Sequence, residues 1–165
     1  GTHHDCGGSD VSADHHKWGL KKMLKLAKSL QATNDPSGNG TLLDNSLLLY
    51  TNEMGDWTTG HNVFSMPAIT FGSCGGYFNT GYFVDYRQKP LKLFQGYHLG
   101  RPYKQLLQSI MTAMGVSKTE YMQFGDGNGF GEFNPNINQF GNVLNGAYSM
   151  YANEHNNPLP WVSKV

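Results

Sequence analysis

Three side chains suited to ligand or metal binding follow an apolar run in the first half of the chain. Glu53 and Asp56 come after the run at 46–51, and His61 precedes a second apolar run at 66–71. Both runs are short and bounded by turn residues, which indicates strands buried on both faces, as in a parallel sheet. Open α/β sheets hold their ligands on loops that leave the carboxyl ends of parallel strands. A site is therefore expected around these three side chains.

Two amphipathic helices are predicted to position these strands. Apolar residues at spacings of three and four predict a helix over 17–31, with Asp14 as its N-cap. A second apolar stripe predicts a helix over 102–114, because proline is tolerated in a first turn and Gly115 is suited to end the helix. A short aromatic strand is predicted over 82–86.

The order of these elements predicts an α/β fold. We expect a three-layer sandwich with a mainly parallel sheet, in which the two apolar runs are adjacent central strands and the two helices cover the faces. The α/β domain is expected to span residues 1–133, as part of a larger assembly. Residues 134–165 have weak periodicity and are predicted to form an irregular C-terminal tail with one short helix over 142–151.

Composition bears on the partners and the compartment. Twelve basic and twelve acidic residues give a net charge of zero, and the lysines spaced along the first predicted helix indicate a solvated helix face, so nucleic acid is not an expected partner. The low share of charged residues, 15%, with abundant glycine and aromatic residues, is typical of exported proteins. We expect a periplasmic or extracellular location. The sequence has no apolar run of roughly 18 residues, so no membrane span is predicted.

Other residue types leave alternatives open. Cys6 and Cys74 could form a disulfide in an oxidising compartment or remain two free thiols. His98 and His155 are expected at the surface. The aromatic residues between positions 77 and 103 could form an interface or pack within the fold. No G-x-S-x-G motif occurs, and Ser73 is near His61 only in sequence, so no nucleophile is identified.

Several motifs, in their order and spacing, resemble one bacterial family. They are LLDNSLLLYTNEMGD (42–56), a loop histidine, MPAITFGSCGGYFNTGYF (66–83), MTAMGV (111–116) and YMQFGDGNG (121–129). Together they resemble the carboxyl-terminal part of the exported family named for its His-x-x-Ser-His-His motif. That family is distantly similar to the alkaline phosphatase and sulfatase superfamily. The resemblance covers roughly residues 3 to 130, and it implies an alkaline-phosphatase-like half.

The resemblance implies a divalent metal site on loops beside the sheet. Zinc accepts imidazole nitrogen and carboxylate oxygen, whereas manganese, magnesium and calcium favour oxygen ligands. A metal there would lower the pKa of bound water or neutralise a phosphoryl or sulfuryl oxygen. Glu53 and Asp56 could instead cap a loop, and His61 could make a structural hydrogen bond. The implied metal ligands are Glu53, His61 and members of the group His3, His4, His15 and His16.

The chain also departs from the family pattern. The naming motif would fall on residues 11–16, where Val11 replaces its first histidine and Asp14 its serine, while the pair His15 and His16 is kept. Family members are far longer, so the chain resembles half of such a protein. A second polypeptide chain or self-association is therefore expected, because a half-sheet leaves a strand edge and apolar surface exposed.

Two functions compete on this basis. The first is an exported metal-binding protein, the metal-holding part of a phosphate or sulfate ester hydrolase. The second is a non-catalytic extracellular module for structure or assembly that retains the scaffold. Glu53 and His61 favour the first function, and the altered motif and the missing other half favour the second.

Overall fold

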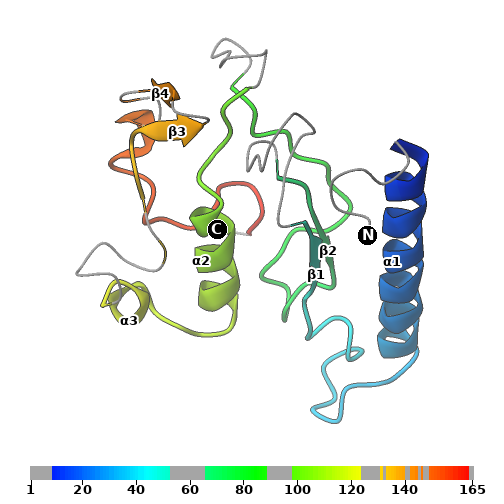
Figure 1. Ribbon diagram of the computed structural model, residues 1–165. Helices are drawn as coiled ribbons and strands as arrows, with labels where there is room; N and C mark the ends of the chain where they lie inside the picture. The colour runs from blue at the N-terminus through cyan, green and yellow to red at the C-terminus, as the bar shows by residue number, and fades with distance from the viewer. Residues whose placement is uncertain are drawn as a thin grey trace.

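The computed structural model of the chain describes residues 9–52, 66–88, 98–123, 131, 133–139, 142–144, 146 and 149–163 (Figure 1). The helices are α1 (Ser9–Gln31), α2 (Lys104–Ala113) and α3 (Lys118–Tyr121), with a 3₁₀ turn, η2 (Ser149–Tyr151). The strands are β1 (Leu48–Thr51), β2 (Ala68–Phe71), β3 (Ile137–Gln139) and β4 (Asn142–Leu144).

The predicted three-layer sandwich with a mainly parallel sheet is wrong. β1 and β2 pair antiparallel as a two-stranded sheet, with Leu48 opposite Phe71 and Thr51 opposite Ala68. The two strands are adjacent, as predicted, but Ala68 and Ile69 are exposed and β1 is only half-buried. An apolar run indicates that a segment is at least partly covered, but it carries no information on strand direction. Direction follows from how the connecting chain returns, which is a long-range property.

Helix α1 packs one narrow face against β1 (Figure 1). It begins at Ser9 rather than near Lys17, so Asp14 lies inside the helix and pairs with Lys17 at 3.1 Å instead of capping it. The less exposed positions recur with helical spacing, and Ala27 is the most buried of them. The lysines of α1 are all exposed, which confirms the predicted solvated face.

The main apolar cluster lies between α2, the loop after β2 and the C-terminal segment. Phe78, Leu106 and Leu159 are its buried members. Leu49 of β1 packs against this cluster, whereas Tyr50 points toward α1. Gly115 has a φ of 84° and ends α2 as predicted, with the amide of Val116 donating to the carbonyl of Met111 at 2.9 Å.

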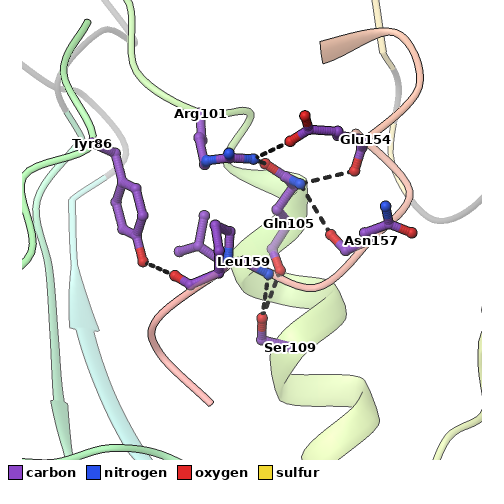
Figure 2. A network of polar contacts seen from close by, with 8 residues as sticks. Tyr86, Arg101, Gln105, Ser109, Glu154, Asn157 and Leu159 are labelled. Atoms are coloured by element: carbon purple, nitrogen blue, oxygen red, sulfur yellow. Dashed lines mark hydrogen bonds and ion pairs between the residues drawn. The ribbon is translucent and has the colours of Figure 1, made fainter. Parts of the chain in front are cut away.

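Helix α2 buries a polar face as well as an apolar one. Gln105, Gln108 and Ser109 have no exposed surface, whereas the apolar side chain of Met114, at the end of the predicted helix, is exposed. The amide group of Gln105 donates to the carbonyls of Glu154 and Asn157 at 2.9 and 3.1 Å (Figure 2). These bonds attach the C-terminal segment to α2. The sequence pattern missed this face because burial of these groups depends on partners some 50 residues away.

The C-terminal segment is held at several further points. The hydroxyl of Tyr86 donates to the carbonyl of Pro160, and the amide of Leu159 donates to the hydroxyl of Ser109 at 2.8 Å (Figure 2). Arg101 forms an ion pair with Glu154 at 2.7 Å. Residues 149–163 therefore form part of the same packed unit as α2.

Two smaller predicted elements differ from the structure. Residues 82–86 form no strand, because Tyr82 and Phe83 lie at the surface and the segment pairs with no neighbouring strand in the described residues. The helix predicted over 142–151 is wrong: β4 pairs antiparallel with β3, and the 3₁₀ turn η2 follows. The described stretches contain no helix with the length and apolar character needed to cross a membrane.

Candidate functional site

Of the predicted metal ligands, the structure describes only the two neighbouring histidines of α1. His15 is exposed, with its ring 6.2 Å from that of His16 and 6.3 Å from that of Trp18. His16 is half-buried against β1. Glu53, His61, His3 and His4, together with Asp56, lie outside the described residues.

His16 is held at the carboxyl end of β1 through both ring nitrogens. Nδ1 lies 2.9 Å from the hydroxyl oxygen of Tyr50, and Nε2 lies 3.3 Å from the side-chain nitrogen of Asn52. If the amide of Asn52 donates to Nε2, the ring proton is on Nδ1 and is donated to Tyr50. Glu53 is the next residue after Asn52, so this histidine lies beside the strand end predicted to carry the site.

Gly19 permits the close approach of α1 and Tyr50. A Cβ atom at this position would lie 2.9 Å from the ring and from the hydroxyl of Tyr50. Any larger residue would therefore displace the tyrosine or the helix. A glycine inside a helix is unfavourable by about 0.5–1 kcal/mol relative to alanine. Here it brings His16 and Tyr50 into contact.

The surroundings of His16 suit a metal-binding imidazole. Such a histidine commonly uses one ring nitrogen as ligand while the other donates to a neighbouring oxygen, which fixes the ring. Tyr50 supplies that oxygen for Nδ1, and Nε2 faces the chain that leads into Glu53. A small cavity of about 170 Å³ lies beside the ring, lined by Leu20, Pro67 and Ile69 among others. Within the described residues, no three His, Cys, Asp or Glu side chains come together as a metal site.

Ser73, the described serine considered as a nucleophile, has a structural role. Its hydroxyl donates to the carbonyl of Asp44 at 2.9 Å and accepts from the amide of Gly76 at 3.1 Å. Cys74 follows it in the same turn, with its Sγ 3.7 Å from the carbonyl oxygen of Ala113, and it is bonded to no other cysteine among the described residues. Cys6 lies outside the described residues, so the pairing of the two cysteines stays a prediction.

A second polar cluster, which the sequence analysis missed, surrounds Lys104 at the start of α2. Its ammonium donates to the carbonyl of Gly131, to the side-chain oxygen of Asn156 and to Nδ1 of His155, at 3.0 to 3.2 Å. His155, expected at the surface, is half-buried, and its ring stacks on Phe133 with centroids 4.0 Å apart. An isolated lysine and a distant histidine carry no sequence signal that they meet.

The cluster holds His155 in its neutral form. An ammonium group can only donate, so Nδ1 of His155 must accept and its ring proton must be on Nε2. Burial, and to a smaller extent the positive charge of Lys104, lowers the pKa of His155 below its ordinary 6.5. Burial likewise lowers the pKa of Lys104.

The lowered pKa of His155 predicts that the folded chain loses stability in mild acid. Because the pKa of folded His155 is lowered, the unfolded chain binds more protons below pH 6.5, so the free energy of unfolding falls as the pH decreases from 6.5 toward the lowered value. Urea titrations at pH 7.5, 6.5, 5.5 and 5.0 would measure this dependence. His155→Gln should flatten it over this interval. An unchanged slope in that variant would contradict the assignment to His155.

Comparison with known proteins gives no relative from which a role could be transferred. No family model, no curated protein and no solved structure matches the chain.

Proposed function

We propose that the chain binds a divalent metal ion at the carboxyl end of β1, with His16 as one ligand. In this proposal it is an exported protein and the metal-holding part of a phosphate or sulfate ester hydrolase. The observation that supports this most is the position of His16, whose Nδ1 is 2.9 Å from the Tyr50 hydroxyl and whose Nε2 faces Asn52. The ring is thus oriented before any metal binds.

Each residue would have a separate part in this site. His16 would supply a nitrogen ligand through Nε2, which would exchange its contact with the Asn52 amide for the metal, and Tyr50 would fix the ring by accepting the proton on Nδ1. Glu53 would add a carboxylate oxygen, and His61, His3 and His4 are the further proposed ligands. A bound zinc, manganese or calcium ion would supply Lewis acidity toward an ester oxygen or toward water. Imidazole nitrogen in the ligand set favours zinc over calcium.

Metal analysis of purified variants tests this proposal. The unaltered chain, incubated with zinc and then dialysed, should retain about one zinc ion per molecule by elemental mass spectrometry. His16→Ala should lose most of this zinc. Tyr50→Phe keeps the ring but removes the hydroxyl, and we expect zinc affinity to fall by about 10- to 100-fold, as for other groups that orient a metal-bound histidine.

His155→Ala is the matched control for these variants. It removes a half-buried imidazole that contacts Lys104, so zinc content should not change. Circular dichroism should first establish that each variant is folded. A chain that retains no zinc, or equal zinc in every variant, would contradict the proposal.

A second candidate function is that of a non-catalytic extracellular assembly module. Large apolar side chains at the surface favour it: Phe83 is 90% exposed, Tyr82 79% and Trp161 76%. In solution such residues favour association with another surface. A chain that binds no metal but associates with itself or with another polypeptide would support this candidate over the first.

A further inference from the structure

A groove of about 670 Å³ separates β2 from the segment that follows it and from the C-terminal residues. One wall is formed by residues 66–70, which include part of β2. Residues 82–87, 100–103 and Trp161 line the groove as well. Leu106 and Leu159, which belong to the buried apolar cluster, also line the groove. The groove is therefore an extension of the core toward the surface.

The groove runs along the edge of β2 rather than over one of its faces. Residues 66 to 70 line it without interruption. Successive side chains of a strand point to opposite faces of the sheet, so a groove over one face would be lined by every second residue. An unbroken series is expected only where the backbone itself borders the groove. The other edge of β2 is occupied by β1.

The groove-side edge of β2 carries no paired strand among the described residues. We call it the open edge of β2. A strand edge presents backbone amide and carbonyl groups at regular spacing, and these groups form hydrogen bonds with any extended polypeptide placed beside them. The chemistry of the edge thus selects a polypeptide in an extended conformation.

Apolar side chains and paired charged side chains line the rest of the groove. Arg87 pairs with Asp85 at 2.7 Å, and Arg101 pairs with Glu154, so each charged side chain in the described lining of the groove has a partner of opposite charge. Tyr82, Phe83 and Trp161 present exposed aromatic surface along it. Charge matching on the protein side gives no advantage to a charged occupant.

The backbone around Trp161 holds this side chain at the groove despite a conformational cost. Its φ is 70°, in the left-handed region that a residue with a Cβ atom rarely adopts. The side-chain amide of Asn79 donates to the carbonyl of Trp161 at 3.0 Å, and the backbone amide of Asn79 donates to the carbonyl of Val162 at 2.7 Å. Strained residues of this kind are concentrated at binding sites.

We propose that an extended, uncharged apolar segment of another polypeptide binds in this groove by pairing its main chain with the open edge of β2. Strand addition of this type uses backbone hydrogen bonds for affinity and side-chain pockets for specificity. The open edge of a second copy is a poor occupant, because in both copies that edge forms one wall of a concave groove. This inference deepens the assembly function, on which it rests, and no proposed metal ligand is among the described residues that line the groove.

The probe is an acetylated and amidated peptide with the sequence of residues 46–52, SLLLYTN, followed by a short uncharged polyethylene glycol chain for solubility. In the fold this sequence pairs with the other edge of β2, so its backbone and side chains suit such pairing. Calorimetry should show saturable binding with a Kd below about 1 mM. The fluorescence of Trp161 should shift to shorter wavelength on binding, and this shift should disappear in Trp161→Phe.

Two N-methylated versions of the peptide test whether its main chain forms the contact. One is methylated at alternate residues beginning with the first, and the other at the remaining alternate residues. Only one set of amides of a strand points toward a given neighbour. One version should therefore bind at least about tenfold more weakly, while the other binds like the parent peptide.

Ala68→Lys tests the location of the site. This residue lines the groove and is exposed, so a lysine there should not disturb folding but should oppose strand addition. We expect peptide affinity to fall at least about tenfold. Gln31→Lys adds the same charge at an exposed position at the end of α1 and should bind the peptide as the unaltered chain does.

Three outcomes of the peptide experiments would overturn the proposal. They are no binding of the parent peptide, equal losses for both N-methylated versions, and unchanged affinity in Ala68→Lys. If the chain alone forms a dimer that Ala68→Lys converts to a monomer, the occupant is a second copy and the proposal of a separate segment fails. Zinc content measured on the same samples reports separately on the proposed metal site.

Discussion

Replacing Gly72 by alanine is expected to destabilise the chain by about 3 kcal/mol or more. The residue has a φ of 88°, and an added Cβ atom would lie 2.3 Å from the carbonyl oxygen of Ser46 and 2.5 Å from that of Leu43. Both contacts are with backbone, so relief would require the loop after β2 to move away from the segment before β1.

That loop is fixed to its neighbour by several bonds, which is why the strain cannot be relieved locally. The amides of Cys74 and Gly75 donate to the carbonyls of Ser46 and Asp44 at 3.0 and 2.8 Å. Moving the loop would break these bonds and disturb the start of β1. With native proteins stable by only about 5–15 kcal/mol, a large fraction of the variant should be unfolded in moderate urea.

Gly76→Ala is a matched control for this prediction. Gly76 also has a φ of 88°, but a Cβ atom there would have no neighbour within 4 Å. The free energy of unfolding of Gly76→Ala should therefore fall only by the cost of holding alanine at this φ, about 1–2 kcal/mol. Urea denaturation followed by circular dichroism would measure both variants. Equal losses would show that the clash with the two carbonyls is absent in solution.

Replacing Gln105 by alanine is the second change with a large expected effect, about 2–4 kcal/mol. The side chain has no exposed surface, and its nitrogen donates to the carbonyls of Glu154 and Asn157. Alanine would leave both carbonyls without this donor and would also create a cavity in place of the buried side chain. Unpaired buried polar groups cost about 1–3 kcal/mol each.

The same variant should release the C-terminal segment from α2. We expect faster hydrogen exchange at the amide of Leu159, which donates to the Ser109 hydroxyl at 2.8 Å. Gln31→Ala, at an exposed position in α1, is the control and should change stability by less than about 0.5 kcal/mol. A loss of comparable size in the two variants would mean that Gln105 does not hold this segment.

Local sequence patterns predicted which segments form regular structure better than how those segments pack. The helices over 17–31 and 102–114 and the strands at both apolar runs exist, with boundaries that differ by up to several residues. The start of α1 differs most from its predicted position. The helix starts at Ser9, eight residues before the predicted start, through a stretch without the apolar spacing used to detect it.

The aromatic residues show why burial could not be predicted one residue at a time. Phe78 is buried and Tyr86 packs against the same cluster, yet Tyr82 and Phe83, equally apolar in the sequence, are at the surface. The difference arises because residues 81–88 form no helix or strand. Only some of their side chains contact α2 and the C-terminal segment. The packing interpretation therefore holds for Phe78 and Tyr86, whereas an interface role for the exposed Tyr82 and Phe83 stays a prediction.

For the candidate site, too, the sequence indicated the residue types and only the fold showed their contacts. The sequence identified His16 and Glu53 as residues with suitable chemistry, and only the folded chain brings His16 to Tyr50 and Asn52 at the end of β1. The contact depends on Gly19, which leaves room for the tyrosine ring. Nothing in the local sequence around His16 indicates that a tyrosine 34 residues later supplies its partner.

The sequence by itself determined that α1, α2, β1 and β2 form, which face of α1 is solvated and where Gly115 ends α2, because periodicity and turn chemistry act over a few residues. The tertiary structure alone decided the antiparallel direction of β1 and β2, the burial of the polar face of α2 and the meeting of Lys104 with His155. These features depend on contacts between segments far apart in the chain, and their free energy is set by which buried groups find partners there.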